Sequence, residues 1–538
     1  MPTLPTELVE QIALHVAVPG LSVAPPAGLQ NLFPLNRAFF NCSHRLRRLE
    51  PNALTPEVLA AELVSRCRAM TRLRRAQVGP TALLPEHDLW TAYLVLLEDD
   101  GLNRQWLLEY VNIRPKVVDN LEVSFAALSD NYSQWPPETV GTALSAWILA
   151  LTDTQAVEYP AGQPALSTED HVVQLLFIFV YTHFLYHSHF GLWYLWDLPV
   201  AADTPLANAA LNFMQSRISP IVPRHRQMHV DANSMPAHFG IQRMMAVPPM
   251  AHAAIACYFG RTPWATRPPM PAEGQDEARR WLNTHWQIGR TRFFGGPEGA
   301  GSEMRDNEWR RLTLCGNLYS GVIPGLGSFV RPGELEGRWD GYFRFPEIRQ
   351  HQEIVAHYPG PPPQTLRPNP FMANVFNQTV QWRLKEYHCL APNVPLSGKQ
   401  EWALDAFFPP GFRQNHRFQD GSLLIYDEMR REWTKYVPHD PSINMGHVLD
   451  TIVLGHADDY WEAAMQRPAI IVYGRVRRAD GLIILRRDAT RSSLGYGNWL
   501  WYGYIHCGLN WIGRFTRTDH DIRTVTQGGS FIMARTAQ

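Results

Sequence analysis

The spacing of apolar residues divides the chain into a helical part and a strand-rich part. In residues 89–101, Trp90, Tyr93 and Leu97 recur every three or four positions and share one face of an amphipathic helix. From about residue 322 the period changes from 3.6 to two, which is typical of half-buried strands. The pattern predicts an α+β multidomain protein, divided into residues 1–50, 51–325 and 326–538.

The first 50 residues are expected to form a module of three short helices. Pro5 suits the first position of a helix, because the N–H group that it lacks would have no partner there. Such a small unit needs a partner, or the rest of the chain, to cover its apolar stripes. The residues that we expect to build this module are Leu4, Pro5, Leu8, Ile12, Leu14, Leu29, Leu32, Leu35 and Phe39.

Residues 51–325 are expected to form an all-α body that ends in a Pro-rich irregular part over residues 200–325. Apolar residues at helical spacing predict helices that include residues 56–63, 89–101, 106–111 and 146–151.

The apolar stretch at residues 172–198 could be mistaken for a membrane span. Its uninterrupted apolar run is far shorter than the ~20 residues that cross a bilayer. His183, His187 and Asp197 would also be costly in lipid. We therefore expect a buried core helix and no membrane partner.

The C-terminal part is expected to form an antiparallel β-barrel. Trp339, Gly341 and Phe343 fall on one face of a predicted strand and alternate with Asp340 and Tyr342 on the other face. A glycine beside a large aromatic residue lets a strand curve into a closed barrel. Closure would remove the exposed edges of the predicted meander. Further strands, separated by turns, are predicted at residues 470–476, 482–486, 499–506, 511–516 and 530–533.

Composition narrows the classes of function. A chain of 538 residues is longer than a single hydrophobic core usually supports, so more than one domain is expected. The net charge of -1 creates no electrostatic field that would attract nucleic acid or an anionic membrane. The six cysteines are dispersed without a CxxC pair, which fits a reducing compartment, and the N-terminus shows no secretory signal. We therefore expect a cytoplasmic and/or nuclear protein that does not bind nucleic acid.

No motif in the sequence indicates catalysis, a metal ion or a cofactor. His183 and His187 share a helical face, but Phe184 stands where a metalloprotease has its glutamate, so hydrogen-bonded core histidines are the simpler interpretation. An acid–base pair of His456 with Asp458 or Asp459 is the weakest functional hypothesis. The sequence therefore favours a protein that is not an enzyme.

Two segments of the N-terminal module resemble an F-box, the helical module by which substrate receptors dock on the Skp adaptor of cullin–RING ubiquitin ligases. They are LPTEL at residues 4–8 and LNRAFF at residues 35–40, in the order that F-boxes show. The resemblance implies that outer apolar residues of the module insert into the Skp adaptor, and that the adaptor and a cullin are partners.

The whole chain is similar to a large group of fungal F-box proteins, with poorer agreement around residues 200–310. Residues 89–101 and 146–151 carry the likeness in the body, and residues 480–483 and 511–514 carry it in the C-terminal part. The resemblance implies a substrate-recognition subunit of an SCF-type ubiquitin ligase, whose barrel binds an unknown target protein. In this hypothesis an aromatic-lined mouth is formed by Trp339, Trp499, Trp501 and Trp511.

The Gly-x-Trp-x-Gly pattern around Trp339 also resembles the first strand of lipocalin-like barrels. A barrel of about eight strands has room for one small ligand, so a protein that binds a small hydrophobic molecule is the alternative. Filling of the barrel by the tryptophans themselves is the simplest interpretation of these residues, because Trp is bulky and small barrels are usually filled by side chains.

Overall fold

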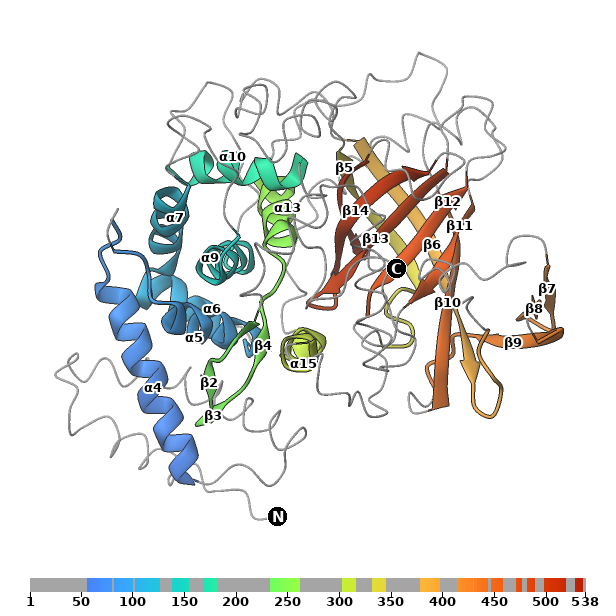
Figure 1. The fold of residues 1–538 in the computed structure, drawn as a ribbon, viewed down its shortest axis with the longest axis horizontal. Helices are drawn as coiled ribbons and strands as arrows, with labels where there is room; N and C mark the ends of the chain where they lie inside the picture. The colour runs from blue at the N-terminus through green and yellow to red at the C-terminus, as the bar shows by residue number, and fades with distance from the viewer. Residues whose placement is uncertain are drawn as a thin grey trace, which may run out of the picture.

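The computed structural model contains a helical body and a β-barrel that follow one another along the longest axis of the molecule (Figure 1). The module expected over residues 1–50 and all of residues 182–232 lie outside the described residues. The structure describes residues 56–79, 82–99, 102–125, 138–153, 168–181, 233–261, 302–315, 331–344, 378–396, 415–428, 430–443, 447–457, 471–476, 481–488, 498–518 and 528–535.

All four segments predicted as helices between residues 56 and 151 contain helical structure, but the segment 89–101 ends its helix at Leu97 and residues 107–111 are π-helical. Helix α4 spans Pro56–Arg75, α5 spans Glu86–Leu97, and α6 spans Leu102–Trp106 before one π-helical turn over Leu107–Val111. The remaining helical elements are α7 (Ile113–Ser124), α9 (Val140–Leu151), α10 (Thr168–Tyr181), α13 (Met250–Arg261), a 3-10 turn (Ser302–Arg305) and α15 (Asp306–Cys315).

Helix α10 is buried in the core and contains residues 172–181 of the predicted buried helix, whose remaining residues 182–198 lie outside the described residues. Val172, Leu176 and Phe179 are buried, and the helix packs against α13 and the last barrel strand. The hydroxyl of Ser530 in that strand donates to the carbonyl oxygen of Val180 at 2.7 Å. Among the described residues, no helix combines the length and the apolar character needed to cross a membrane.

The body is not all-α, because residues 233–246 form two small antiparallel sheets. A turn at Phe239 and Gly240, with φ of 50° and 72°, joins one pair of strands in the left-handed geometry that suits a hairpin. Strands of two residues show no alternation, so the apolar spacing alone does not predict them. The pairs are β1 (Asn233–Ser234) with β4 (Met245–Ala246), and β2 (Ala237–His238) with β3 (Ile241–Gln242).

Eight antiparallel strands of the described C-terminal part close a barrel, as predicted. Neighbouring strands follow one another up and down, and pairing of β15 with β5 closes the wall, with Phe531 opposite Phe343. The strands are β5 (Gly337–Arg344), β6 (Gln378–Leu390), β10 (Val448–Ala457), β11 (Ile471–Val476), β12 (Ile483–Asp488), β13 (Asn498–His506), β14 (Asn510–Thr518) and β15 (Gly528–Arg535).

Glycines let the strands approach closely enough for the wall to curve. A Cβ atom on Gly341 would lie 2.0 Å from the carbonyl oxygen of Ile532, and one on Gly503 would lie 2.0 Å from that of Ile512. A side chain at either position would force neighbouring strands apart.

The barrel wall is buried on its inside and, where the body covers it, on its outside. In β13, Trp501 and Ile505 belong to the core inside the barrel, whereas Tyr502 and Tyr504 belong to a core shared with the helices. Helix α13 contacts β14 and β15. One continuous apolar core therefore joins the body to the barrel.

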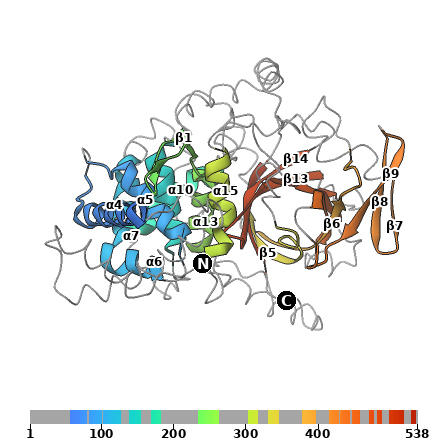
Figure 2. The ribbon, with the colours of Figure 1, turned by 90° about the horizontal axis from the view of Figure 1, so that it is seen from below.

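A three-stranded sheet is inserted between β6 and β10 and projects from the barrel (Figure 2). We call it the extension, residues 416–438. Its inner face packs on the barrel through Leu423, Ile425 and Tyr436, which are buried. The hydroxyl of Tyr436 donates to Asp450 of β10 at 2.6 Å. The strands are β7 (His416–Gln419), β8 (Ser422–Asp427) and β9 (Glu432–Pro438).

Candidate functional site

The tryptophans predicted to line a mouth lie mostly inside the barrel. Trp339, Trp501 and Trp511 are at most 1% exposed, and Trp499 is half-buried against the same core. Trp382, which the sequence pattern does not single out, has its ring centroid 4.8 Å from that of Trp501 and 5.5 Å from that of Trp511. The barrel interior is therefore a packed aromatic core, and its buried rings present no surface to a protein partner.

Three indole N–H groups in this core have no hydrogen-bond partner among the described residues. They belong to Trp382, Trp501 and Trp511, whereas the indole of Trp339 donates to the carbonyl oxygen of Leu335 at 2.9 Å. A buried donor without an acceptor costs about 1–3 kcal/mol. An oxygen atom of a bound water or ligand would remove that cost by accepting a hydrogen bond. These three N–H groups are therefore the places inside the barrel where a bound molecule could be held by hydrogen bonds.

A turn over residues 331–336 packs on the barrel just before β5. Leu335 of this turn is fully buried in the aromatic core. The N–H groups of Gly333 and Leu335 donate to the two carboxylate oxygens of Glu386 in β6, at 2.8 and 2.5 Å. Burial nevertheless raises the pKa of Glu386 to about 8. This carboxyl group therefore fastens the turn to the barrel.

Two histidines lie beside the carboxyl group of Glu386. Nε2 of His388 is 3.5 Å from Oε2 of Glu386 and 3.4 Å from Nδ1 of His439, which follows β9. Burial, reinforced by His439, lowers the pKa of His388 to about 4, so its imidazole is neutral at pH 7. These three residues could hold a metal ion. The sequence pattern predicts no metal site, because a long stretch of chain separates His439 from the other two.

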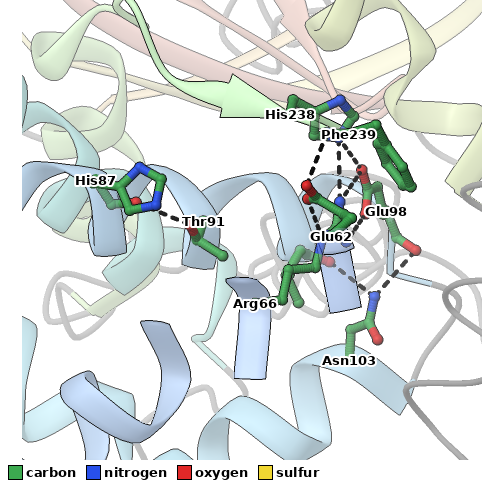
Figure 3. A network of polar contacts seen from close by, with 9 residues as sticks. Glu62, Arg66, His87, Thr91, Glu98, Asn103, His238 and Phe239 are labelled. Carbon is green, nitrogen blue, oxygen red and sulfur yellow. Dashed lines mark hydrogen bonds and ion pairs between the residues drawn. The ribbon is translucent and has the colours of Figure 1, made fainter. Parts of the chain in front are cut away.

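A second buried polar cluster lies in the helical body (Figure 3). Arg66 of α4 pairs with Glu62 at 2.7 Å and with Glu98 at 2.5 Å. From the hairpin, His238 Nε2 lies 2.8 Å from Glu98, and the N–H of Phe239 donates to Glu62 at 2.9 Å. Although burial opposes its charge, Arg66 and His238 hold the pKa of Glu98 well below its usual range. The cluster fastens the hairpin to two helices.

A third buried cluster joins the body to the barrel. Nε2 of His506 in β13 lies 2.9 Å from Nδ1 of His252 in α13. The other ring nitrogen of His506, Nδ1, lies 3.3 Å from Oε2 of Glu308 in α15. Although burial opposes the charge, His506 and Arg311 lower the pKa of Glu308 to about 2, while burial lowers the pKa of His506. All four side chains are buried from solvent. We interpret this cluster as a clamp between the two parts.

The extension presents an exposed aromatic and basic face. The guanidinium carbon of Arg417 in β7 lies 4.4 Å from the ring centroid of Trp433 in β9, and Tyr426 of β8 contacts the same ring. Trp433 is 43% exposed. Phe418 of β7 is 57% exposed but lies on the other face of the sheet, opposite Leu423, with its ring centroid 6.0 Å from that of Tyr387. Exposed Trp, Tyr and Arg are the residues that most often dominate protein–protein contacts.

Of the candidate acid–base residues, His456 falls within the described residues. His456 lies in β10, opposite Arg383 of β6 and Ile471 of β11. The candidates that fall outside the described residues are Asp458, Asp459, His183, His187 and the module residues Leu4, Pro5, Leu8, Ile12, Leu14, Leu29, Leu32, Leu35 and Phe39.

Comparison with known proteins identifies no relative of the chain. No protein-family model, curated protein or solved structure matches it. The resemblance to F-box proteins therefore rests on the sequence segments themselves.

Proposed function

We propose that the chain is the non-catalytic substrate-recognition subunit of an SCF-type ubiquitin ligase. The observation that carries the proposal is the pair of F-box-like segments, LPTEL at residues 4–8 and LNRAFF at residues 35–40, which precede α4. Outer apolar residues of this module would dock on the Skp adaptor by helix-in-groove contacts, and the adaptor would bind the cullin. The complex would act in the cytoplasm or the nucleus.

The shape of the molecule supports a receptor that holds two partners apart. Helix α4, which follows the module, lies at one end of the longest axis, and the extension lies at the other end (Figures 1 and 2). The continuous core between body and barrel would keep that separation constant. We assign target binding to the exposed face with Arg417 and Trp433. The receptor would act by proximity and contribute no reacting group.

We expect the double variant Leu8→Asp with Ile12→Asp to lose capture of the Skp adaptor and cullin. The two side chains lie on one stripe of the predicted helix, and placing charges in an apolar contact costs several kcal/mol. A loss of about 100-fold or more in captured adaptor should follow. Affinity capture of the full chain from cells, with quantitative immunoblotting, measures it.

The matched control places aspartates on the opposite side of the same predicted helix. Thr6→Asp with Glu10→Asp places aspartates away from the stripe, adds one negative charge where the test variant adds two, and should leave capture unchanged. Capture of the Leu8→Asp, Ile12→Asp chain at the wild-type level, or no capture by the wild type, would contradict the proposal.

A barrel that binds a small hydrophobic molecule is the second candidate function. The unpartnered indole N–H groups of Trp382, Trp501 and Trp511 favour it, because an apolar ligand with a carbonyl or hydroxyl oxygen would satisfy them.

For this second candidate, we expect native mass spectrometry of the full chain to detect a non-covalent adduct that denaturation releases. Trp501→Phe keeps a ring but removes the N–H group, so it should weaken retention about 5- to 10-fold, the value of one net hydrogen bond. Trp433→Phe, on the exposed face, should retain the adduct. Wild-type protein without an adduct would favour simple filling of the barrel instead.

A further inference from the structure

We propose that Glu386, His388 and His439 bind one divalent transition-metal ion, for which zinc is the best fit. The three residues meet where β6, the turn over residues 331–336 and the end of β9 come together. Their ligand atoms all lie within 4.8 Å of one another. The proposal is independent of the proposed function, and it departs from the sequence pattern, which predicts no metal.

Two of the three distances between the ligand atoms fit a tetrahedral ion, and the ligand atoms of Glu386 and His439 lie within 4.8 Å of each other. With bonds of ~2.0–2.1 Å, two ligands of tetrahedral zinc are about 3.3–3.4 Å apart. Nε2 of His388 lies 3.4 Å from Nδ1 of His439 and 3.5 Å from Oε2 of Glu386. A separation of 3.4 Å is at the long end for a hydrogen bond between two imidazoles, and it equals the spacing of two ligands on a tetrahedral ion.

Contacts from neighbouring residues hold the side chains of His388 and His439 in the positions that a shared ion would need. Oγ1 of Thr451 lies 3.1 Å from Nδ1 of His388 and can accept a hydrogen bond from an N–H group there. In that tautomer the lone pair of Nε2 faces the cluster. The backbone N–H of His439 donates to the backbone carbonyl oxygen of Glu386 at 2.9 Å and fixes the position of this residue beside β6. A Cβ atom on Gly333 would lie 2.3 Å from Nε2 of His439, so glycine makes room for that ring. Such outer contacts are typical of metal sites.

The residue types select the kind of ion. Two imidazoles and a carboxylate suit zinc and its neighbours, whereas magnesium and calcium prefer oxygen ligands. Glu386 is 1% exposed, and in the part of the chain that the structure describes no Lys or Arg pairs with it. A bound cation would replace the proton of this buried group and compensate the negative charge of the carboxylate. Because His439 is half-buried, water can supply the fourth ligand.

The ion would tie the extension to the barrel. Strand β9 pairs with β6 through Pro438 opposite Tyr387 and Val437 opposite His388. His439 is the next residue along the chain. An ion bound by both His439 and His388 would therefore crosslink the end of β9 to β6, next to the two residue pairs that already join these strands. Zinc should therefore stabilise the extension against the barrel wall.

Titration of the full chain with zinc tests the proposal. Protein stripped with EDTA should bind one zinc ion per chain by isothermal titration calorimetry, and its melting temperature should rise with zinc concentration. Cobalt(II) in the same site should give the intense visible absorption of a tetrahedral complex. His439→Ala should weaken zinc binding about 100-fold or more, and Thr451→Val about 10- to 100-fold through loss of the outer contact.

The control is His447→Ala, which removes an exposed histidine near the start of β10 and should bind zinc as the wild type does. Far-UV circular dichroism and melting of the zinc-free variants, compared with zinc-free wild type, separate lost binding from lost folding. Three results would overturn the site: no stoichiometric zinc in the wild type, wild-type affinity in the His439→Ala and Thr451→Val variants, or an equal loss in His447→Ala.

Discussion

Replacing Arg66 with methionine should lower the melting temperature of the helical body by on the order of 10 °C. The change removes the guanidinium that pairs with Glu62 and Glu98 and leaves both carboxylates buried. Breaking a buried ion pair costs about 3–5 kcal/mol, and each kcal/mol lowers the melting temperature of a unit of this size by about 2–4 °C. Thermal unfolding at pH 7, followed by far-UV circular dichroism, measures the change.

The matched control is Arg68→Met, which removes an exposed arginine of the same helix and should change stability by less than about 0.5 kcal/mol. Acid provides a second readout. Because the folded-state pKa of Glu98 is depressed, its stabilisation is complete above the ordinary value of 4.5 and is lost as the pH falls below it. In the Arg66→Met variant, the loss of stability on acidification should be smaller, because Arg66 no longer lowers the pKa of Glu98. Equal melting of the Arg66 and Arg68 variants would contradict the prediction.

Trp501→Ala should destabilise the barrel by about 3–5 kcal/mol, because it empties the centre of the aromatic core. The ring of Trp501 stacks on Phe515 at a centroid distance of 4.7 Å, and it contacts Trp382 at 4.8 Å and Phe531 at 4.9 Å. Urea unfolding followed by near-UV circular dichroism, which reports aromatic packing, should show an earlier transition.

The control for this variant is Trp433→Ala, the same substitution on the outer face of the extension. Trp433 is 43% exposed and leaves no internal cavity, so we expect its unfolding midpoint to stay close to that of the wild type. If the alanine variants at positions 501 and 433 had the same stability, the aromatic core would not be a principal support of the barrel.

Local patterns predict much of the fold. Helical spacing around Trp90 and alternation around Trp339 each repeat within a few residues, and both elements form where the pattern indicates them. The patterns fail where elements are short or where distant contacts decide the outcome. The hairpin at Phe239 is held by Glu62 of α4, and strand β10 is held by β6 and β11 on its two sides.

The polar clusters show why the candidate sites are harder to predict than the fold. Glu386 and His388 are two positions apart on one strand, but His439 reaches them after the whole extension has folded back. His252 and His506 belong to different parts of the molecule and meet only because the body packs on the outside of the barrel. No spacing motif links such residues in the sequence.

The sequence by itself determined the order of the helical and strand-rich parts, the strands that carry Trp339 and Trp501, and the F-box-like pattern that motivates the proposed function. Tertiary structure alone decided that the barrel closes between β15 and β5 and that the tryptophans point into it. It also brought the three proposed metal ligands together. The reason is physical: periodicity reports which face of an element is buried, whereas the partner that covers this face is set by packing between segments far apart in the chain.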